Sequence, residues 1–232
     1  MSLTLGVLGG MGPAATLDFL AKLQAYTPAK TERDHIRTLV DINPQVPDMS
    51  VPGSGAGPVL AEMAGALRGA GADVLAIACN SAHAWADLIQ RASGLPLVDM
   101  IGAAASTARA SGARRVGVLG SRAALCLYRE YLAAQAMGQV TLPADRQELF
   151  LKTIDRIRAG ERGGEVRQIL QALVQDLVAG GAEVIITGCT EIPLALDQED
   201  VRVDLIDPAE ALARRCVAVC LGAEPVPAMP TA

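Results

Sequence analysis

Short apolar segments alternate along the chain with longer segments in which apolar residues recur at helical spacing. The short segments are rich in β-branched and aliphatic residues and end in turn residues, which is typical of buried parallel strands. They occupy residues 5–10, 38–42, 71–79, 97–99, 116–121, 181–189 and 205–207. The longer segments predict helices over residues 14–25, 59–69, 84–91, 101–110, 123–135, 165–179 and 208–221. This alternation predicts parallel sheets with right-handed helical crossovers.

The segments also repeat. Residues 71–79 (GADVLAIAC) match residues 181–189 (GAEVIITGC) with an offset of 110 at every position. Two further pairs match in the same order at offsets of 111 and 108, namely residues 5–10 with 116–121 and residues 97–99 with 205–207. Three matching pairs in one order indicate a duplicated α/β unit.

We therefore predict an α/β fold of two pseudo-symmetric three-layer (αβα) lobes with mainly parallel sheets. The first lobe is expected to comprise residues 1–98 and 208–232, and the second residues 99–207. Ligands of open parallel sheets bind beyond the carboxyl ends of the strands. The active site is therefore expected in the cleft between the two lobes.

Composition excludes several classes of function. The 232 residues carry a net charge of −5 and only six aromatic side chains, which argues against a nucleic-acid partner. No apolar run approaches the roughly 18 residues needed to span a bilayer. The first ten residues lack the positive charge of a signal peptide. We expect a cytoplasmic protein with neither a membrane nor a nucleic acid as its partner.

Two of the five cysteines occupy equivalent positions of the repeat. Cys79 and Cys189 each end a predicted buried strand, and polar residues typical of helix starts follow each of them. The positive end of a helix dipole lowers the pKa of a thiol, so each is a candidate base or nucleophile. Two such thiols on opposite sides of a small molecule would invert a carbon centre, one removing a proton and the other returning one.

The remaining cysteines and the two histidines point to no metal. Cys216 and Cys220 share one face of the last predicted helix, and Cys126 lies in an apolar helix, so all three are expected to pack. The chain contains no Cys-x-x-Cys motif. We expect neither a metal nor a cofactor.

Two glycine- and proline-rich loops are candidates for substrate binding. The loop that contains Gly10 and Met11 follows the first strand, and its backbone N–H groups could hold a small anion. Residues 10–15 also match the dinucleotide fingerprint loosely, which leaves a non-catalytic module for a small anion or nucleotide as an alternative. Asn43 and Gln45 follow the second strand, either as ligand contacts or as part of a proline-stiffened turn.

Five motifs together resemble the aspartate/glutamate racemase family, most closely its aspartate racemases and related cofactor-independent amino-acid racemases. They are residues 9–13 (GGMGP), 34–36 (DHI), 43–48 (NPQVPD), 79–83 (CNSAH) and 188–193 (GCTEIP). The resemblance implies an isomerase that uses Cys79 and Cys189 as opposed acid and base at the α-carbon, without pyridoxal phosphate, and commonly as a homodimer. The substrate contacts it implies are Asn80, Ser81 and Thr190, with Gly10, Met11 and Gln45 nearby. Asn43, Glu191 and Arg158 complete the set of candidate substrate-binding residues.

The sequence departs from the family pattern at one important position. Met49 stands where aspartate racemases carry an arginine after Pro-Asp, whereas Arg158 keeps the charge of the later Ile-Lys-x-Gly pattern. Loss of an arginine removes a bidentate partner for a side-chain carboxylate, which puts aspartate in doubt. The substrate could instead be glutamate, a neutral or apolar amino acid, or a dicarboxylate. A maleate isomerase-like or decarboxylase reaction is therefore a second enzymatic alternative.

Overall fold

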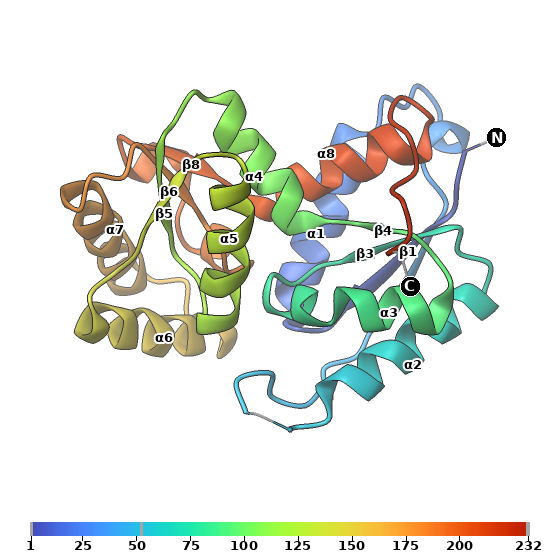
Figure 1. The fold of residues 1–232 in the computed structure, drawn as a ribbon, viewed down its shortest axis with the longest axis horizontal. Coiled ribbons are helices and arrows are strands. Elements are labelled where there is room, and N and C mark those ends of the chain that lie inside the picture. The colour runs from blue at the N-terminus through green and yellow to red at the C-terminus, as the bar shows by residue number, and fades with distance from the viewer. Residues whose placement is uncertain (1, 52, 231–232) are drawn as a thin grey trace. The chain divides into compact units, whose positions relative to one another are not determined.

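The computed structural model describes residues 2–51 and 53–230 (Figure 1). The chain divides into two compact units. The first comprises Met1–Met100 with Ala209–Ala232, and the second comprises Ile101–Pro208. Each unit contains one four-stranded parallel sheet with helices on both of its faces, as the sequence predicts.

The sheet of the first unit has the strand order β2-β1-β3-β4. Its strands are β1 (Leu5–Gly9), β2 (Thr38–Ile42), β3 (Val74–Ile77) and β4 (Leu97–Val98). Helices α1 and α8 cover one face and helices α2 and α3 the other (Figure 1). Their bounds are α1 (Pro13–Tyr26), α2 (Ala56–Gly69), α3 (Ala86–Ser93) and α8 (Pro208–Cys220). Two short 3₁₀ turns, η1 (Glu32–Asp34) and η2 (Ser81–Trp85), precede β2 and α3.

The sheet of the second unit has the equivalent order β6-β5-β7-β8. Its strands are β5 (Arg115–Val118), β6 (Gly138–Val140), β7 (Val184–Ile186) and β8 (Asp204–Ile206). Helices α4 and α5 cover one face, and α6 and α7 cover the other. Their bounds are α4 (Met100–Ala110), α5 (Arg122–Ala134), α6 (Ala144–Arg158) and α7 (Gly164–Ala179). The 3₁₀ turns η3 (Ile192–Leu194) and η4 (Gln198–Asp200) lie between β7 and β8.

The duplication extends to the register of the strands and to their packing. Gly6 pairs with Leu75 in the first sheet, and Gly117 pairs with Ile185 at the equivalent point of the second. A Cβ atom on Gly6 would lie 2.9 Å from Cδ2 of Leu75, and one on Gly117 would overlap Cδ1 of Ile185. Each glycine therefore allows the same close approach of neighbouring side chains and of the covering helix.

One strand and one α-helix of the described residues lie outside the predicted set. Strand β6 is a three-residue edge strand, and helix α6 carries many charged residues on its exposed side. The buried side of α6 nevertheless presents Phe150, Ile154 and Ile157, which share one helical face. Among the residues that the structure describes, no helix is both long enough and apolar enough to cross a membrane.

Candidate active site

In the first unit, the loops after β1 and β2 pack closely together. Gly10 has a positive φ of 96°, and a Cβ atom there would overlap the backbone of Asn43. The N–H of Gly10 donates to Oγ1 of Thr16 (2.9 Å), and the N–H of Asn43 donates to the carbonyl of Gly9 (3.3 Å). Only glycine fits at position 10, and its N–H is already used within the loop. Binding of an anion by the other N–H groups of this loop stays a prediction.

The loop after β2 is stabilised by its own polar side chain. Oδ1 of Asn43 accepts a hydrogen bond from the backbone N–H of Gln45 (2.9 Å), which closes an Asx turn. The side chain of Gln45 is exposed. Of the two roles left open by the sequence, the structure gives Asn43 the turn role, and ligand contact by either residue stays a prediction.

Cys79 follows β3 and lies at the same edge of the first sheet. Cys79 and Asn80 are both buried, and the ring of His83 packs directly beneath them in the turn η2. The Nδ1 atom of His83 lies 2.9 Å from the carbonyl oxygen of Cys79, while Nε2 accepts from the N–H of Met100 (3.2 Å). These partners define a neutral ring that is protonated at Nδ1.

The histidine therefore supports the backbone of the cysteine. Burial lowers the pKa of His83, although Asp99, with Oδ1 4.0 Å from Nε2, opposes this effect. The ring stays neutral at pH 7 and joins the turn after β3 to the start of α4. His83 thus holds the backbone turn that carries Cys79.

In the second unit, Cys189 follows β7 at the equivalent edge. Its Sγ donates to Oε2 of Glu191 (3.0 Å), and Oε1 of Glu191 accepts from Nε of Arg158 (3.2 Å). The side chain of Glu191 is only 4% exposed, whereas that of Arg158 is 53% exposed. Thiol, carboxylate and guanidinium thus form one continuous chain of hydrogen bonds, in which Glu191 is placed to accept the proton of Cys189.

The electrostatic setting of Cys189 differs from the sequence expectation of a lowered pKa. Burial raises the pKa of the Cys189 thiol well above its usual value, and the neighbouring Glu191 carboxylate raises it further, while Arg158 partly opposes them. The expected helix dipole is missing because the three-residue 3₁₀ turn η3, not an α-helix, follows the cysteine. Cys189 is therefore a protonated thiol at neutral pH.

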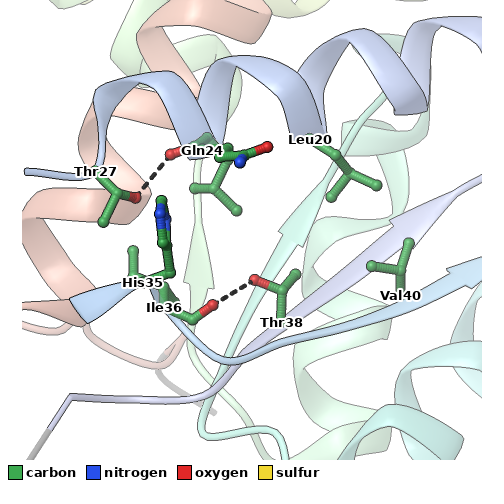
Figure 2. Close-up of a pocket in the computed structure, with 8 residues that line it drawn as sticks. Leu20, Gln24, Thr27, His35, Ile36, Thr38 and Val40 are labelled. Atoms are coloured by element: carbon green, nitrogen blue, oxygen red, sulfur yellow. Dashed lines mark hydrogen bonds between the residues drawn. The ribbon is translucent and has the colours of Figure 1, made fainter. Parts of the chain in front are cut away.

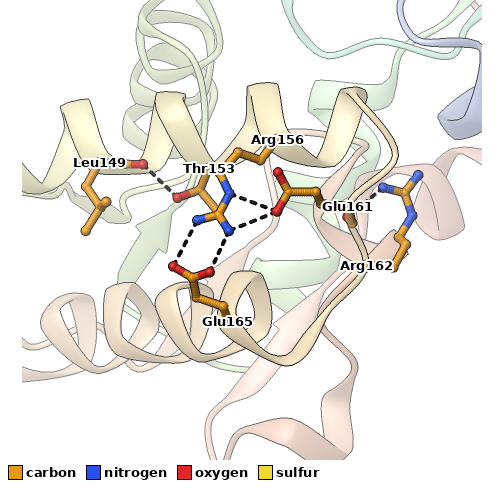
Figure 3. A network of polar contacts seen from close by, with 6 residues as sticks. All are labelled: Leu149, Thr153, Arg156, Glu161, Arg162 and Glu165. Atoms are coloured by element: carbon orange, nitrogen blue, oxygen red, sulfur yellow. Dashed lines mark hydrogen bonds and ion pairs between the residues drawn. The ribbon is translucent and has the colours of Figure 1, made fainter.

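An ion-pair network holds the end of α6, from which Arg158 extends. Figure 3 shows the guanidinium of Arg156 between two carboxylates. Its Nη2 atom lies 2.9 Å from Oε2 of Glu161 and 2.8 Å from Oε2 of Glu165. These charges are largely exposed, so each pair contributes little free energy alone. Together they join α6 to α7 across the connecting turn and so restrict the position of the helix end beside Arg158.

A pocket of about 300 Å³ lies apart from these residues, between α1 and the edge strand β2 (Figure 2). It contains none of the predicted site residues. Its lining residues are Leu20, Leu23, Gln24, Thr27, His35, Ile36, Thr38 and Val40. Among residues 2–51 and 53–230, no group of three or more His, Cys, Asp or Glu side chains is arranged to hold a metal ion.

The predicted site residues thus gather in two groups, one in each unit. The first unit carries Gly10, Met11, Asn43, Gln45, Cys79, Asn80 and Ser81 after its strands, and the second carries Arg158, Cys189, Thr190 and Glu191. Sequence reasoning missed Thr16, which holds the Gly10 loop, and Gln147, whose Nε2 donates to the carbonyl of Gly120 (2.8 Å). Nothing in the local sequence marks Gln147, because its contact lies 27 positions away.

The chain thus combines a duplicated parallel α/β fold with a cysteine after the equivalent strand of each sheet. The model of the Asp/Glu/Hydantoin racemase family matches residues 8–216, and the chain belongs to that family. A glutamate racemase from Synechococcus sp. (strain CC9605) is 31% identical over 180 residues, which cover 74% of this chain and 65% of that protein.

Two further relatives extend over nearly the whole chain. The broad-specificity amino-acid racemase RacX from Bacillus subtilis (strain 168) is 25% identical over 228 residues, which cover 94% of this chain and 98% of RacX. The solved structure of Picrophilus torridus aspartate racemase has a TM-score of 0.83 at 24% identity and covers 94% of each chain. The chain therefore spans just under two thirds of the Synechococcus protein but almost all of these two.

Proposed function

We propose that this protein is a cofactor-independent amino-acid racemase in which Cys79 and Cys189 act as opposed acid and base at the α-carbon. Membership of the Asp/Glu/Hydantoin racemase family supports racemisation of an amino acid as the reaction. The observation that carries the two-cysteine mechanism is the equivalence of the thiols. Each follows the third strand along the chain of its unit, in sheets of equivalent strand order.

The proposed reaction balances with one thiolate and one thiol. A thiolate on one face of the substrate removes the α-proton, and the resulting carbanion takes a proton from the thiol on the opposite face. That second cysteine becomes the thiolate, so the configuration is inverted and no net proton is lost. The mechanism requires one thiol on each face of the substrate, and each unit supplies one of the two cysteines.

Glu191 has a defined part in this scheme. The pKa of Cys189 is raised, so this cysteine needs a proton acceptor before it can act as the base. The Glu191 carboxylate, 3.0 Å from Sγ, is that acceptor, and Arg158 orients it from the other side. When Cys189 acts as the acid, it already carries the proton that it donates.

Hydrogen exchange at the α-carbon tests the proposal. The protein is incubated with single enantiomers of the proteinogenic amino acids in D₂O, and deuterium incorporation and optical inversion are followed separately. Cys79→Ala and Cys189→Ala should each abolish inversion, while either variant can keep exchange at the face served by the surviving thiol. Cys126→Ala removes an exposed cysteine on α5 and is the matched control, for which full inversion is expected.

The outcomes separate this proposal from its alternatives. Absence of α-deuterium incorporation with every amino acid would contradict racemisation. Inversion that persists in either active-site variant would contradict the two-cysteine mechanism while leaving racemisation intact.

A further inference from the structure

The loops that follow the strands are unusually poor in positive charge. In both units they occupy residues 10–12, 43–51, 53–55, 78–80, 99, 119–121, 141–143, 187–191 and 207. The sequence of these loops contains no lysine and no arginine, but it contains Asp48, Asp99, Glu191 and Asp207. Ligands of parallel sheets are bound by these loops. The loops provide hydroxyl, amide and backbone groups that can bind the α-carboxylate of a substrate. They provide no cation for a second, side-chain carboxylate.

The positive charge that reaches the cysteine of the second unit is already engaged. Arg158 donates from Nε to Glu191 at 3.2 Å and from Nη1 to Asp155 at 3.3 Å. One guanidinium thus faces two carboxylates, and the side chain of Glu191 is almost fully buried while that of Arg158 is half exposed. A substrate with a side-chain carboxylate would bring a third negative charge to this one guanidinium, and the two carboxylates already beside it would repel that charge.

The first unit presents partly buried apolar side chains in the loops after β1 and β2. Met11, Val46 and Met49 are half-buried and pack against the cluster of buried residues that contains Leu8 and Cys79. They belong to the loops after β1 and β2, at the edge where Gly10 and Asn43 meet. Unbranched methionine side chains adapt to apolar groups of different shape. Contact with their exposed parts would remove the apolar side chain of a substrate from water, which lowers the free energy of the complex.

We propose that the substrate is an amino acid with an apolar side chain, aliphatic or thioether, and not a dicarboxylic one; this specificity rests on the racemase function proposed above. The loops select against a second carboxylate because they carry acids and no bases. The surface formed by Met11, Val46 and Met49 selects for an apolar side chain. Two different features of the chain, one in each unit, therefore favour the same substrate class.

The test compares substrates under identical conditions. α-Deuterium incorporation is measured for methionine, leucine and valine, for aspartate and glutamate, and for lysine and arginine, each as single enantiomers. We expect kcat/KM for the best apolar substrate to exceed that for either acidic one by about tenfold or more, as expected when a desolvated carboxylate lacks a partner. Exchange with no amino acid would contradict the racemase function itself. Exchange that favours acidic or basic amino acids would contradict only the specificity.

Substitution of Met49 gives an independent readout. Met49→Arg places a cation on the apolar surface and should lower kcat/KM for apolar amino acids while raising it for aspartate or glutamate, shifting their ratio by about tenfold or more. Leu221→Arg adds the same charge after α8, at a residue 40% exposed, and controls for net charge. An unchanged ratio in a folded Met49→Arg variant would contradict the role of this surface. So would the same shift in both variants.

Discussion

Replacement of Glu191 by glutamine probes the chain of hydrogen bonds behind Cys189. The substitution keeps the size of the side chain and an oxygen that accepts from the thiol, but the amide cannot take up the proton. A positioned proton acceptor typically contributes about 10²–10⁴-fold to a reaction rate, or about 3–5 kcal/mol of the barrier at 1.36 kcal/mol per factor of ten. We expect a loss of inversion in this range. Exchange at the face served by Cys79 should be retained.

The same structure predicts that the Glu191→Gln variant folds. Arg158 is 53% exposed and keeps Asp155 at 3.3 Å, so it is neither buried nor left without an anion. The loss in the free energy of unfolding should be about 1 kcal/mol or less. Thermal unfolding checks this independently of activity. Asp155→Asn removes the exposed carboxylate from the same arginine and is the matched control, with little effect expected on inversion.

The pH profile distinguishes a proton acceptor from a merely structural residue. In the native protein, burial and then Glu191 raise the pKa of Cys189. Removal of the Glu191 charge leaves only burial to raise the pKa of Cys189. The part of the pH–rate profile that reports the titration of Cys189 should therefore move to lower pH. Inversion within about threefold of the native rate, together with no shift of this part of the profile, would refute the role assigned to Glu191.

Two further predictions concern stability. Gly117→Ala should destabilise the protein by about 1–3 kcal/mol because its Cβ would overlap Ile185. Gly65→Ala lies in open space on α2 and should stabilise the protein by up to about 1 kcal/mol. Urea unfolding measures both changes, and equal effects would contradict the close packing at Gly117. The pKa of His83 is lowered from 6.5 by burial, so its contribution to stability is complete above pH 6.5 and is lost as the pH falls toward the lowered value. Between pH 7 and pH 5, the free energy of unfolding of His83→Asn, measured by denaturation, should fall less than that of the native protein.

Much of the fold could be predicted because its signals are local. The apolar runs of β1, β3, β5 and β7 are buried in both sheets, and the repeat offset aligns the strands of one unit with those of the other along the chain. Strand β6 was missed because an edge strand of three residues needs no apolar run. Helix α6 was missed because its many charged residues obscure the apolar face formed by Phe150, Ile154 and Ile157.

The candidate site could be predicted in part. The equivalence of Cys79 and Cys189 is a property of the repeat, so the sequence alone indicated it. The pKa of Cys189 could not be inferred in this way. It depends on whether an α-helix or a short turn follows the strand, and on how deeply the thiol is buried. Each of these changes the energy of the charged form, and the residue order does not reveal them.

The amino-acid sequence by itself determined the alternation of strands and helices, the duplication and the pair of equivalent cysteines, because these follow from periodicity and repetition along one dimension. Only the tertiary structure decided which groups surround each thiol. Arg158 and Glu191 are 33 positions apart, and Cys79 and Met100 meet through the ring of His83. Such contacts arise when the fold brings together segments that are far apart in the chain, and they set the electrostatic environment of each cysteine.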